Sequence, residues 1–216
     1  MEVNRTILDM KILNTFIIFY VEGIAMAWPN RMLDGSARSW TLNHLYHERA
    51  CYLADPVKES EMFLPNQTWL MGQILPPFQR DLVWDINRMV RFIESAVYGL
   101  HLGTWVYNNA ADAPMSVING KQFYHPTDKW LIDGQQRLTA LDKFFNDDFQ
   151  VFGSTWSQVD RPRQRMFLAN THFAAFETRI YDEAILRELY DRLNFGGVAH
   201  TEDQRASLTS VLPRTS

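Results

Sequence analysis

Residues 129–144, KWLIDGQQRLTALDKF, join an apolar run to an amphipathic segment through a short polar turn. The run KWLI is typical of a strand. After the turn, apolar side chains recur at helical spacing on one face, namely Leu138, Leu141 and Phe144 or Phe145. A helix with one apolar face buries that face against another element, so we expect this helix to pack on a sheet. The segment predicts a strand, turn and helix unit.

The remaining pattern predicts a mixture of helices and short strands. Helices are predicted over residues 7–28, 41–54, 85–99 and 182–193, with a short final helix that begins at Thr201. Strands are predicted over residues 69–75, 104–108, 149–152 and 173–180, and Asn119-Gly120 joins two short runs as a hairpin. Residues 28–40 have the composition of a loop, and the basic stretch 160–165 is compatible with an extended segment.

The composition limits the classes of function. The 216 residues are 46% hydrophobic and 21% charged, which suits one domain with an appendage. A formal charge of −4 excludes the overall basic character of constitutive DNA-binding proteins, so any contact with nucleic acid must be local.

The cysteine content and the apolar runs bear on the cellular compartment of the protein. Cys51 is the single cysteine, which excludes a disulfide framework and a zinc site built from several cysteines. The most apolar early run, residues 12–21, is shorter than the roughly 20 residues that span a bilayer and lacks the basic leader of a secretory signal. We expect a cytoplasmic protein.

Arg137 stands in the first turn of the predicted helix, where unpaired backbone N–H groups and a partial positive charge disfavour a cation. Asp133 can cap that turn, which contributes about 1 kcal/mol, but a cap does not explain residues 134–136. A glycine lets the backbone approach a ligand, and an arginine can hold two phosphate oxygens. The segment therefore predicts a phosphate-binding turn, with an ion pair from Arg137 to Asp133 or Asp142 as the alternative.

Two further polar segments follow predicted elements. Gln79 and Arg80 come after two prolines and an aromatic residue at the end of the strand predicted over 69–75. Asn194 precedes two glycines at the end of the helix predicted over 182–193. Each segment has a structural interpretation, as an exposed loop or a plain helix end, and a functional one as a wall of the same pocket.

Four segments in this order resemble a known family: PPFQRDLVW, FIESAVYGLHLGTW, LIDGQQRLTAL and DRLNFGGVAHTEDQR. Over about residues 69–206 the chain resembles the ParB/sulfiredoxin-like DGQQR-motif domains. These form the N-terminal domain of modification-dependent restriction and phage-defence proteins of the GmrSD, SspE and BrxU type. The resemblance implies an α+β fold with a ParB/sulfiredoxin-like core, a small mixed sheet flanked by helices, and a mainly helical N-terminal extension. The expected parts are an accessory segment 1–66, the DGQQR domain 67–206 and a tail 207–216.

The resemblance also implies a nucleoside-triphosphate site that uses Mg²⁺. Carried over by position, the catalytic residues would be Asp133, Arg137 and Gln136, with Asp133 as the metal ligand. The nucleotide-binding residues would be Gly134, Gln135, Gln79, Arg80 and Asn194. No Walker-type GxxxxGK[ST] occurs, so phosphate binding would not be of the P-loop kind.

Three activities are open to such a site. The domain would hydrolyse the terminal phosphate, transfer it to a hydroxyl such as that of a modified DNA base, or act as a non-catalytic nucleotide or DNA sensor for a partner protein. The expected partners are a nucleotide, DNA with modified bases, and a partner protein or a second copy of the chain. The restriction enzymes of this family append a nuclease domain, whereas we find no nuclease motif in this sequence, and its first 60 or so residues match no pattern of the family.

Overall fold

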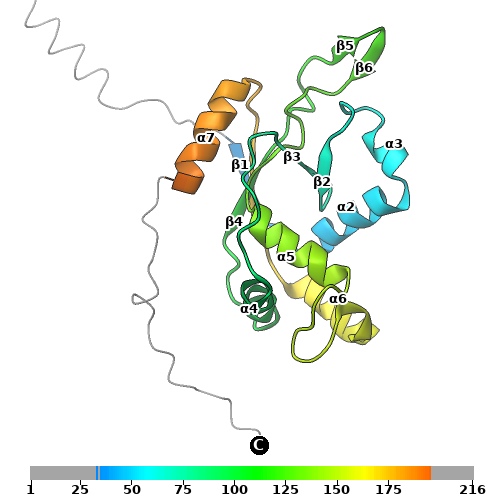
Figure 1. Ribbon diagram of the computed structural model, residues 1–216, viewed down its shortest axis with the longest axis vertical. Coiled ribbons are helices and arrows are strands. Elements are labelled where there is room, and N and C mark those ends of the chain that lie inside the picture. Colours follow the sequence, from blue (N-terminus) through cyan, green and yellow to red (C-terminus); the bar gives the residue numbers. More distant parts are fainter. Residues whose placement is uncertain (1–32, 34, 196–216) are drawn as a thin grey trace, which may run out of the picture. The chain divides into compact units, whose positions relative to one another are not determined.

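The structure is a computed structural model that describes Leu33 and residues 35–195 (Figure 1). Its elements are β1 (Gly35–Arg38), α2 (Leu42–Ala54), α3 (Pro56–Ser60), β2 (Thr68–Leu70), β3 (Gln73–Leu75), α4 (Ile86–Val97), β4 (Thr104–Asn108), β5 (Ser116–Ile118), β6 (Lys121–Phe123), β7 (Leu131–Asp133), α5 (Gln135–Phe145), α6 (Arg161–Asn170), β8 (Ala174–Thr178) and α7 (Glu183–Phe195), with a short 3-10 helix at Trp156–Gln158. This mixture confirms the predicted α+β class.

A four-stranded mixed sheet in the order β1-β8-β4-β7 forms the centre of the domain. Strand β4 pairs in parallel with β8 and antiparallel with β7, and β1 closes the far edge antiparallel to β8. A strand with neighbours on both sides has its backbone N–H and C=O groups paired on both sides, and the side chains of Trp105 to Asn108 of β4 are all buried. Strand β7 is held in place by its hydrogen bonds to β4, and β7 leads directly into the turn at Gly134.

Helices α2, α4 and α5 pack against one face of this sheet, and α7 lies on the other side in Figure 1. The core between sheet and helices includes the fully buried side chains Leu42, Leu45, Ile93, Trp105, Leu131, Leu138, Leu141 and Phe173. Because Leu42 and Leu45 belong to α2, the described chain from residue 35 onward forms one unit. The domain boundaries expected after residues 66 and 206 stay predictions.

Most of the predicted elements are confirmed. Helices α2, α4, α5 and α7 and strands β4, β7 and β8 lie where periodicity predicts them, and β5 and β6 turn at Asn119 and Gly120. Thr41 is the N-cap of α2, although its side chain makes no capping hydrogen bond. The helices predicted over 7–28 and from Thr201 lie outside the described residues.

Four segments differ from prediction. Residues 35–38 of the expected loop form β1, because β8 supplies hydrogen-bond partners that the local sequence does not reveal. The strand predicted over 69–75 is a hairpin of β2 and β3, which turns at Met71 and Gly72 with positive φ.

The chain between α5 and β8 also differs. The strand predicted over 149–152 is reduced to a single bridge from Val151 to Ser154. The basic stretch is not extended but begins helix α6, where Asp160 accepts a hydrogen bond from the backbone N–H of Arg163 and a proline occupies the first turn. Pro fits this position because its missing N–H is not needed there.

A buried carboxylate links three strands of the sheet. Glu177 of β8 is 3% exposed and accepts hydrogen bonds from Arg38 of β1, at 3.1 Å from Nε and 2.9 Å from Nη2, and from the Tyr107 hydroxyl of β4 at 2.7 Å. Burial alone would raise the pKa of this carboxyl, but the hydrogen bonds from Arg38 and Tyr107 outweigh it and lower the pKa of Glu177 to about 2. Burial and the bond to Glu177 raise the pKa of Tyr107. Glu177 is therefore ionised in the folded protein.

No helix in residues 35–195 has the length and apolar character needed to cross a bilayer.

Candidate functional site

Gly134 connects β7 to α5 and is the N-cap of that helix, with φ 107° in the left-handed region. A Cβ atom at this position would lie 2.6 Å from the Cβ of Trp105 on the neighbouring strand β4. Both the positive φ and the close approach of β4 require glycine. The packing of the domain is thus sufficient to explain this glycine, independently of any ligand.

Asp133 and Arg137 form an ion pair across the turn. The Arg137 Nη2 lies 2.8 Å from the Asp133 Oδ2, and the guanidinium also donates to the carbonyl oxygens of Leu102 at 3.2 Å and Thr104 at 3.0 Å. The Arg137 side chain is only 18% exposed. The alternative ion pair with Asp133 is therefore the arrangement present in the structure, and Asp133 does not cap α5. Asp142 pairs with Arg49 instead, at 2.7 Å.

Gln136 holds the loop that precedes α4. Its Oε1 accepts hydrogen bonds from the backbone N–H groups of Val83 and Trp84, each at 3.1 Å, and its Nε2 donates to the carbonyl of Asp81 at 3.3 Å. The carbonyl oxygen of this amide is thereby fully occupied. Gln136 acts as a positioning residue that brings residues 81–84 against the start of α5.

Gln79 and Arg80 approach the same turn from the segment after β3. Gln79 Nε2 donates to the carbonyl of Leu131 at 3.1 Å, and the backbone N–H of Arg80 donates to the Tyr190 hydroxyl at 3.1 Å. The Arg80 guanidinium has no hydrogen-bond or ion-pair partner among the described residues. Asn194, on α7, donates from Nδ2 to the carbonyl of Tyr190 at 2.9 Å.

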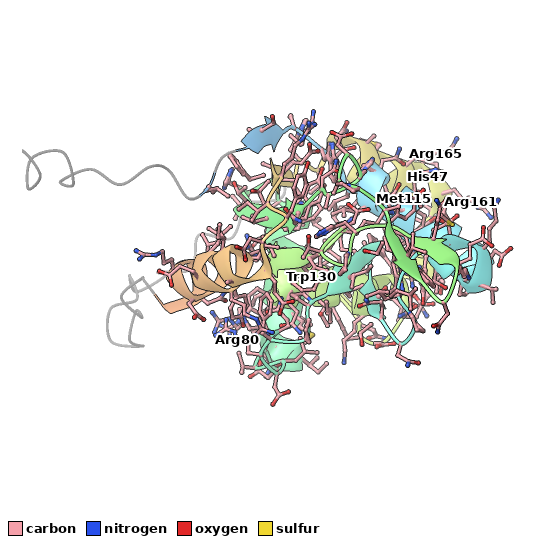
Figure 2. The ribbon with its side chains drawn as sticks, turned by 90° about the horizontal axis from the view of Figure 1, so that it is seen from above. His47, Arg80, Met115, Trp130, Arg161 and Arg165 are labelled. Carbon is pink, nitrogen blue, oxygen red and sulfur yellow. The ribbon has the colours of Figure 1, made fainter. Side chains whose placement is uncertain are left out.

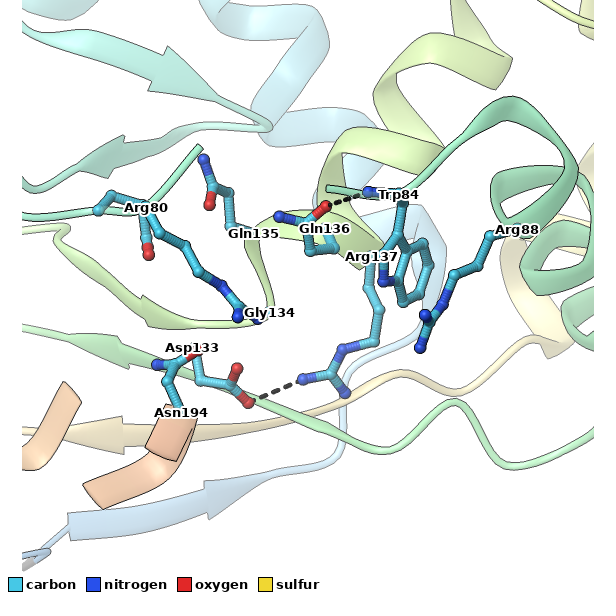
Figure 3. Close-up of a pocket in the computed structure, with 10 residues that line it drawn as sticks. Arg80, Trp84, Arg88, Asp133, Gly134, Gln135, Gln136, Arg137 and Asn194 are labelled. Carbon is cyan, nitrogen blue, oxygen red and sulfur yellow. Dashed lines mark hydrogen bonds and ion pairs between the residues drawn. The ribbon is translucent and has the colours of Figure 1, made fainter. Parts of the chain in front are cut away.

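These segments enclose a cavity of about 210 Å³ at the start of α5 (Figure 3). Its lining is Gln79, Arg80, Trp84, Arg88, Asp133, Gly134, Gln135, Gln136, Arg137 and Asn194. Every residue that the sequence analysis assigned to the site is therefore in the lining. Three of the lining residues are arginines and one is a carboxylate, so the cavity carries an excess of positive charge.

Arg88 is the lining cation that the sequence analysis missed. It lies in the first turn of α4, and its guanidinium stacks over the Trp84 ring with 5.0 Å to the ring centroid. In Figure 3 its side chain extends towards Arg137, whereas that of Arg80 extends towards Gly134. A cation in the first turn of a helix was the signal that singled out Arg137, and the same signal was present at Arg88.

The N-terminus of α5 is open towards this cavity. The first hydrogen bond of the helix runs from the Leu138 N–H to the Gly134 carbonyl at 2.9 Å. No side chain caps the helix, and the backbone N–H groups of residues 135–137 have no acceptor in the part of the chain that the structure describes. Unpaired N–H groups with a partial positive charge favour an anion over a cation.

The lining contains one acidic side chain, Asp133. Residues 35–195 contain no group of three or more His, Cys, Asp or Glu side chains placed to hold a metal ion. Mg²⁺ does not require such a group, because it is commonly held by one or two carboxylates together with substrate phosphates and water. The donor set thus fits Mg²⁺ only in the company of a phosphate ligand.

Comparison with known proteins identifies the family. Residues 67–205 match the family described as GmrSD restriction endonuclease, N-terminal domain. No curated protein and no solved structure matches the chain. The matched segment contains all of the lining residues, and it extends over more than half of the sequence. The chain therefore belongs to the family of GmrSD restriction endonuclease N-terminal domains.

Proposed function

We propose that the cavity at the start of α5 binds a nucleoside triphosphate together with a divalent cation, and that the domain cleaves or transfers the terminal phosphate. Membership of a restriction-endonuclease family places the chain in the context of DNA restriction and phage defence. In hydrolysis, a water oxygen bonds to the terminal phosphorus while the bond between that phosphorus and the bridging oxygen breaks. The products are the nucleoside diphosphate and inorganic phosphate.

The observation that carries this proposal is the open N-terminus of α5 beside the guanidinium groups of Arg80 and Arg88. Neither guanidinium has a carboxylate partner among the described residues, and both line the cavity. A charge-assisted hydrogen bond contributes roughly 1.5–3 kcal/mol, so two such groups and free backbone N–H donors favour a polyanion strongly. We therefore assign direct phosphate contacts to Arg80 and Arg88.

Asp133 is the residue that we propose for the cation or the attacking water. Arg137 fixes the Asp133 carboxylate through the 2.8 Å ion pair and is itself fixed by two backbone carbonyls. A bound divalent cation neutralises charge on the phosphates and lowers the pKa of water. The chain's own contribution would be to hold one carboxylate, and two arginines that have no carboxylate partner among the described residues, around the phosphate chain.

A second candidate is a nucleotide sensor without turnover. Two groups that a hydrolase would use already have partners in the protein. Asp133 is paired with Arg137, and the Gln136 Oε1 accepts hydrogen bonds from the backbone N–H groups of residues 83 and 84. This favours a sensor. A sensor needs only binding, and the guanidinium groups of Arg80 and Arg88 and the helix N-terminus support binding of an anion.

One experiment distinguishes these activities. The protein is incubated with Mg²⁺ and a triphosphate labelled on its terminal phosphate, with and without DNA that carries hydroxymethylated bases. Free labelled phosphate supports hydrolysis, labelled DNA supports transfer, and binding without either product supports a sensor. Absence of binding to every triphosphate by folded protein would overturn the proposal.

The arginine assignment has a matched control on the same helix. We expect Arg88→Ala to weaken triphosphate binding by about 10- to 100-fold, because one charge-assisted contact is lost. Arg91 lies one turn further along α4, is exposed and is not in the cavity lining. Arg91→Ala should therefore leave affinity unchanged in isothermal titration calorimetry. Equal effects of the two substitutions would exclude a specific role for Arg88.

A further inference from the structure

We infer that the chain forms a two-fold dimer through an apolar patch beside α6, in which Phe152 of each copy enters a hollow in the other. The apolar patch is defined by four exposed side chains: Val97, Tyr98, Phe152 and Met166. None of them lines the cavity at the start of α5, so the inference is independent of the proposed nucleotide site. In Figure 2, Arg161 and Arg165 of α6 lie well apart from Arg80 of that cavity.

The hollow at the centre of the patch is mostly apolar and larger than the cavity at the start of α5. Its volume is about 420 Å³, within the range of roughly 300–1,000 Å³ that is common for ligand pockets. Its walls come from the ends of α4 and α5, from residues 151–159 and from α6, and they include the aromatic side chains of Phe144, Trp156 and Phe167. An aromatic side chain from a partner therefore fits the hollow in both size and chemistry.

Phe152 has a backbone conformation that phenylalanine rarely adopts. With Gly153 it connects the bridged residues 151 and 154, and the φ angles of the two are 51° and 75°. Positive φ at both central residues is typical of a type I′ turn, in which Asn-Gly is preferred and a bulky first residue is an outlier. The chain uses that preferred pair, Asn119-Gly120, in the turn between β5 and β6. Phenylalanine at position 152 therefore destabilises its turn relative to asparagine.

The contacts of Phe152 within one copy offset little of this cost. Its side chain is 55% exposed, and its ring contacts that of Tyr98 edge-on at 5.5 Å, although Tyr98 is itself 67% exposed. Strained backbone positions cluster at binding sites, and aromatic side chains are the usual anchors of protein interfaces. We therefore assign Phe152 to contact with a partner.

The patch is complementary to itself, which identifies the partner as a second copy. It has both a projecting aromatic side chain and an apolar hollow, and an isologous contact requires each copy to supply both. Its charges also balance, because Arg163 is the charged residue of the hollow among those described and is paired with Asp160. About a two-fold axis, Arg163 of each copy can approach Asp160 of the other. Nucleic acid or an anionic membrane would instead call for a surplus of cations in the lining.

The exposed apolar area suits a weak dimer. Two aromatic and two aliphatic side chains, each about half exposed, offer on the order of 300 Å² of apolar surface per copy. A standard interface buries about 800 Å² per partner, of which a little more than half is apolar. The patch would supply most of that apolar share, so we expect a dissociation constant of about 10–100 μM.

Sedimentation velocity of the full chain from about 1 to 500 μM tests this inference. We expect the mass to rise from that of the 25.3 kDa chain to twice that value, with a midpoint at about 10–100 μM. A wild-type chain that stays monomeric at the highest concentration would overturn the inference.

Phe152→Asn separates association from folding. We expect the dimer to weaken by about 100-fold or more, because two-fold symmetry removes the anchor twice. At about 1 μM, where the chain is monomeric, the variant should unfold at no lower temperature than wild type, because asparagine suits the turn. Val57→Asn is the matched control, since Val57 is 78% exposed on α3 outside the patch, and its variant should dimerise as wild type. Wild-type association by Phe152→Asn would refute the inference, and Met166→Glu provides a second disruption that leaves the turn unchanged.

Methionine oxidation locates the contact. Met166 is 62% exposed in the patch, and Met115, 38% exposed before β5, is the internal reference. Peptide mass spectrometry after hydrogen peroxide treatment should show Met166 oxidised several-fold more slowly at about 500 μM than at about 1 μM, with Met115 unchanged. A dimer in which Met166 keeps its oxidation rate would place the contact elsewhere. A monomer in which Met166 is protected at every concentration would show that another segment of the chain covers the patch, and either result would overturn the inference.

Discussion

A Gly134→Ala variant is expected to unfold about 6–12 °C below the wild-type protein, which corresponds to a loss of roughly 3 kcal/mol. Two effects add. Alanine is strained at φ 107°, and its Cβ would lie 2.6 Å from the Trp105 Cβ on β4, which is buried and cannot yield without moving the sheet. The measurement is thermal unfolding followed by circular dichroism.

Gly99 provides the matched control. It also has a positive φ, 73°, but a Cβ at this position meets no atom within 4 Å. Gly99→Ala should therefore show the conformational cost alone, about 1–2 kcal/mol. If both variants lose the same stability, the close contact between the turn and β4 contributes nothing, and the packing explanation for Gly134 is wrong.

The second large effect concerns acid stability and Glu177. Its pKa falls from an ordinary value of 4.5 to about 2 in the folded protein. Because folding lowers this pKa, the ionised carboxylate stabilises the native state fully above about pH 4.5, and that contribution is lost as the pH falls towards 2. A shift of this size corresponds to about 3 kcal/mol. Urea denaturation of the wild-type protein should show this loss across the same window.

Glu177→Gln removes the titrating group. We expect the variant to be less stable than wild type at about pH 6 and to lose less stability on acidification, so that the two stability curves converge near pH 2. Glu188→Gln, an exposed carboxylate paired with Arg192 on α7, is the control that should keep the wild-type pH dependence. Parallel curves for wild type and Glu177→Gln would rule out this carboxylate as the source of the acid sensitivity.

Elements with a strong local signal were predictable from the sequence. In α4, apolar residues such as Met89 and Ile93 recur at helical spacing and are buried, and in β4 the run TWVYN is buried almost throughout. Strand β1 has no such signal, since GSAR is mostly exposed and is a strand only through its pairing with β8. Asp160 and Pro162 did carry the signature of a helix start at α6, but the alternating arginines masked it.

The candidate site was predictable in its residues but not in their partners. The DGQQR segment and the more distant Gln79, Arg80 and Asn194 all meet in one lining. The acceptors that hold Arg137 include the backbone carbonyls of Leu102 and Thr104, and no side-chain pattern encodes the direction of a carbonyl in a distant segment. For the same reason the sequence favoured a phosphate at Arg137. The cations at this cavity that have no carboxylate partner among the described residues are instead Arg80 and Arg88.

The pairing of β1 with β8 determines the order in which this sheet can be completed during synthesis. Arg38 and Glu177, which join the two strands, are 139 residues apart. At about 5–20 residues per second, a ribosome needs roughly 7–28 s to add that interval. Throughout this time β1 emerges as an unpartnered edge, and its brevity and the charge of Arg38 are features that discourage association with strands of other nascent chains. Among the strands that the structure describes, β1 is translated first and β8 last, so this sheet cannot be completed before β8 has left the ribosome.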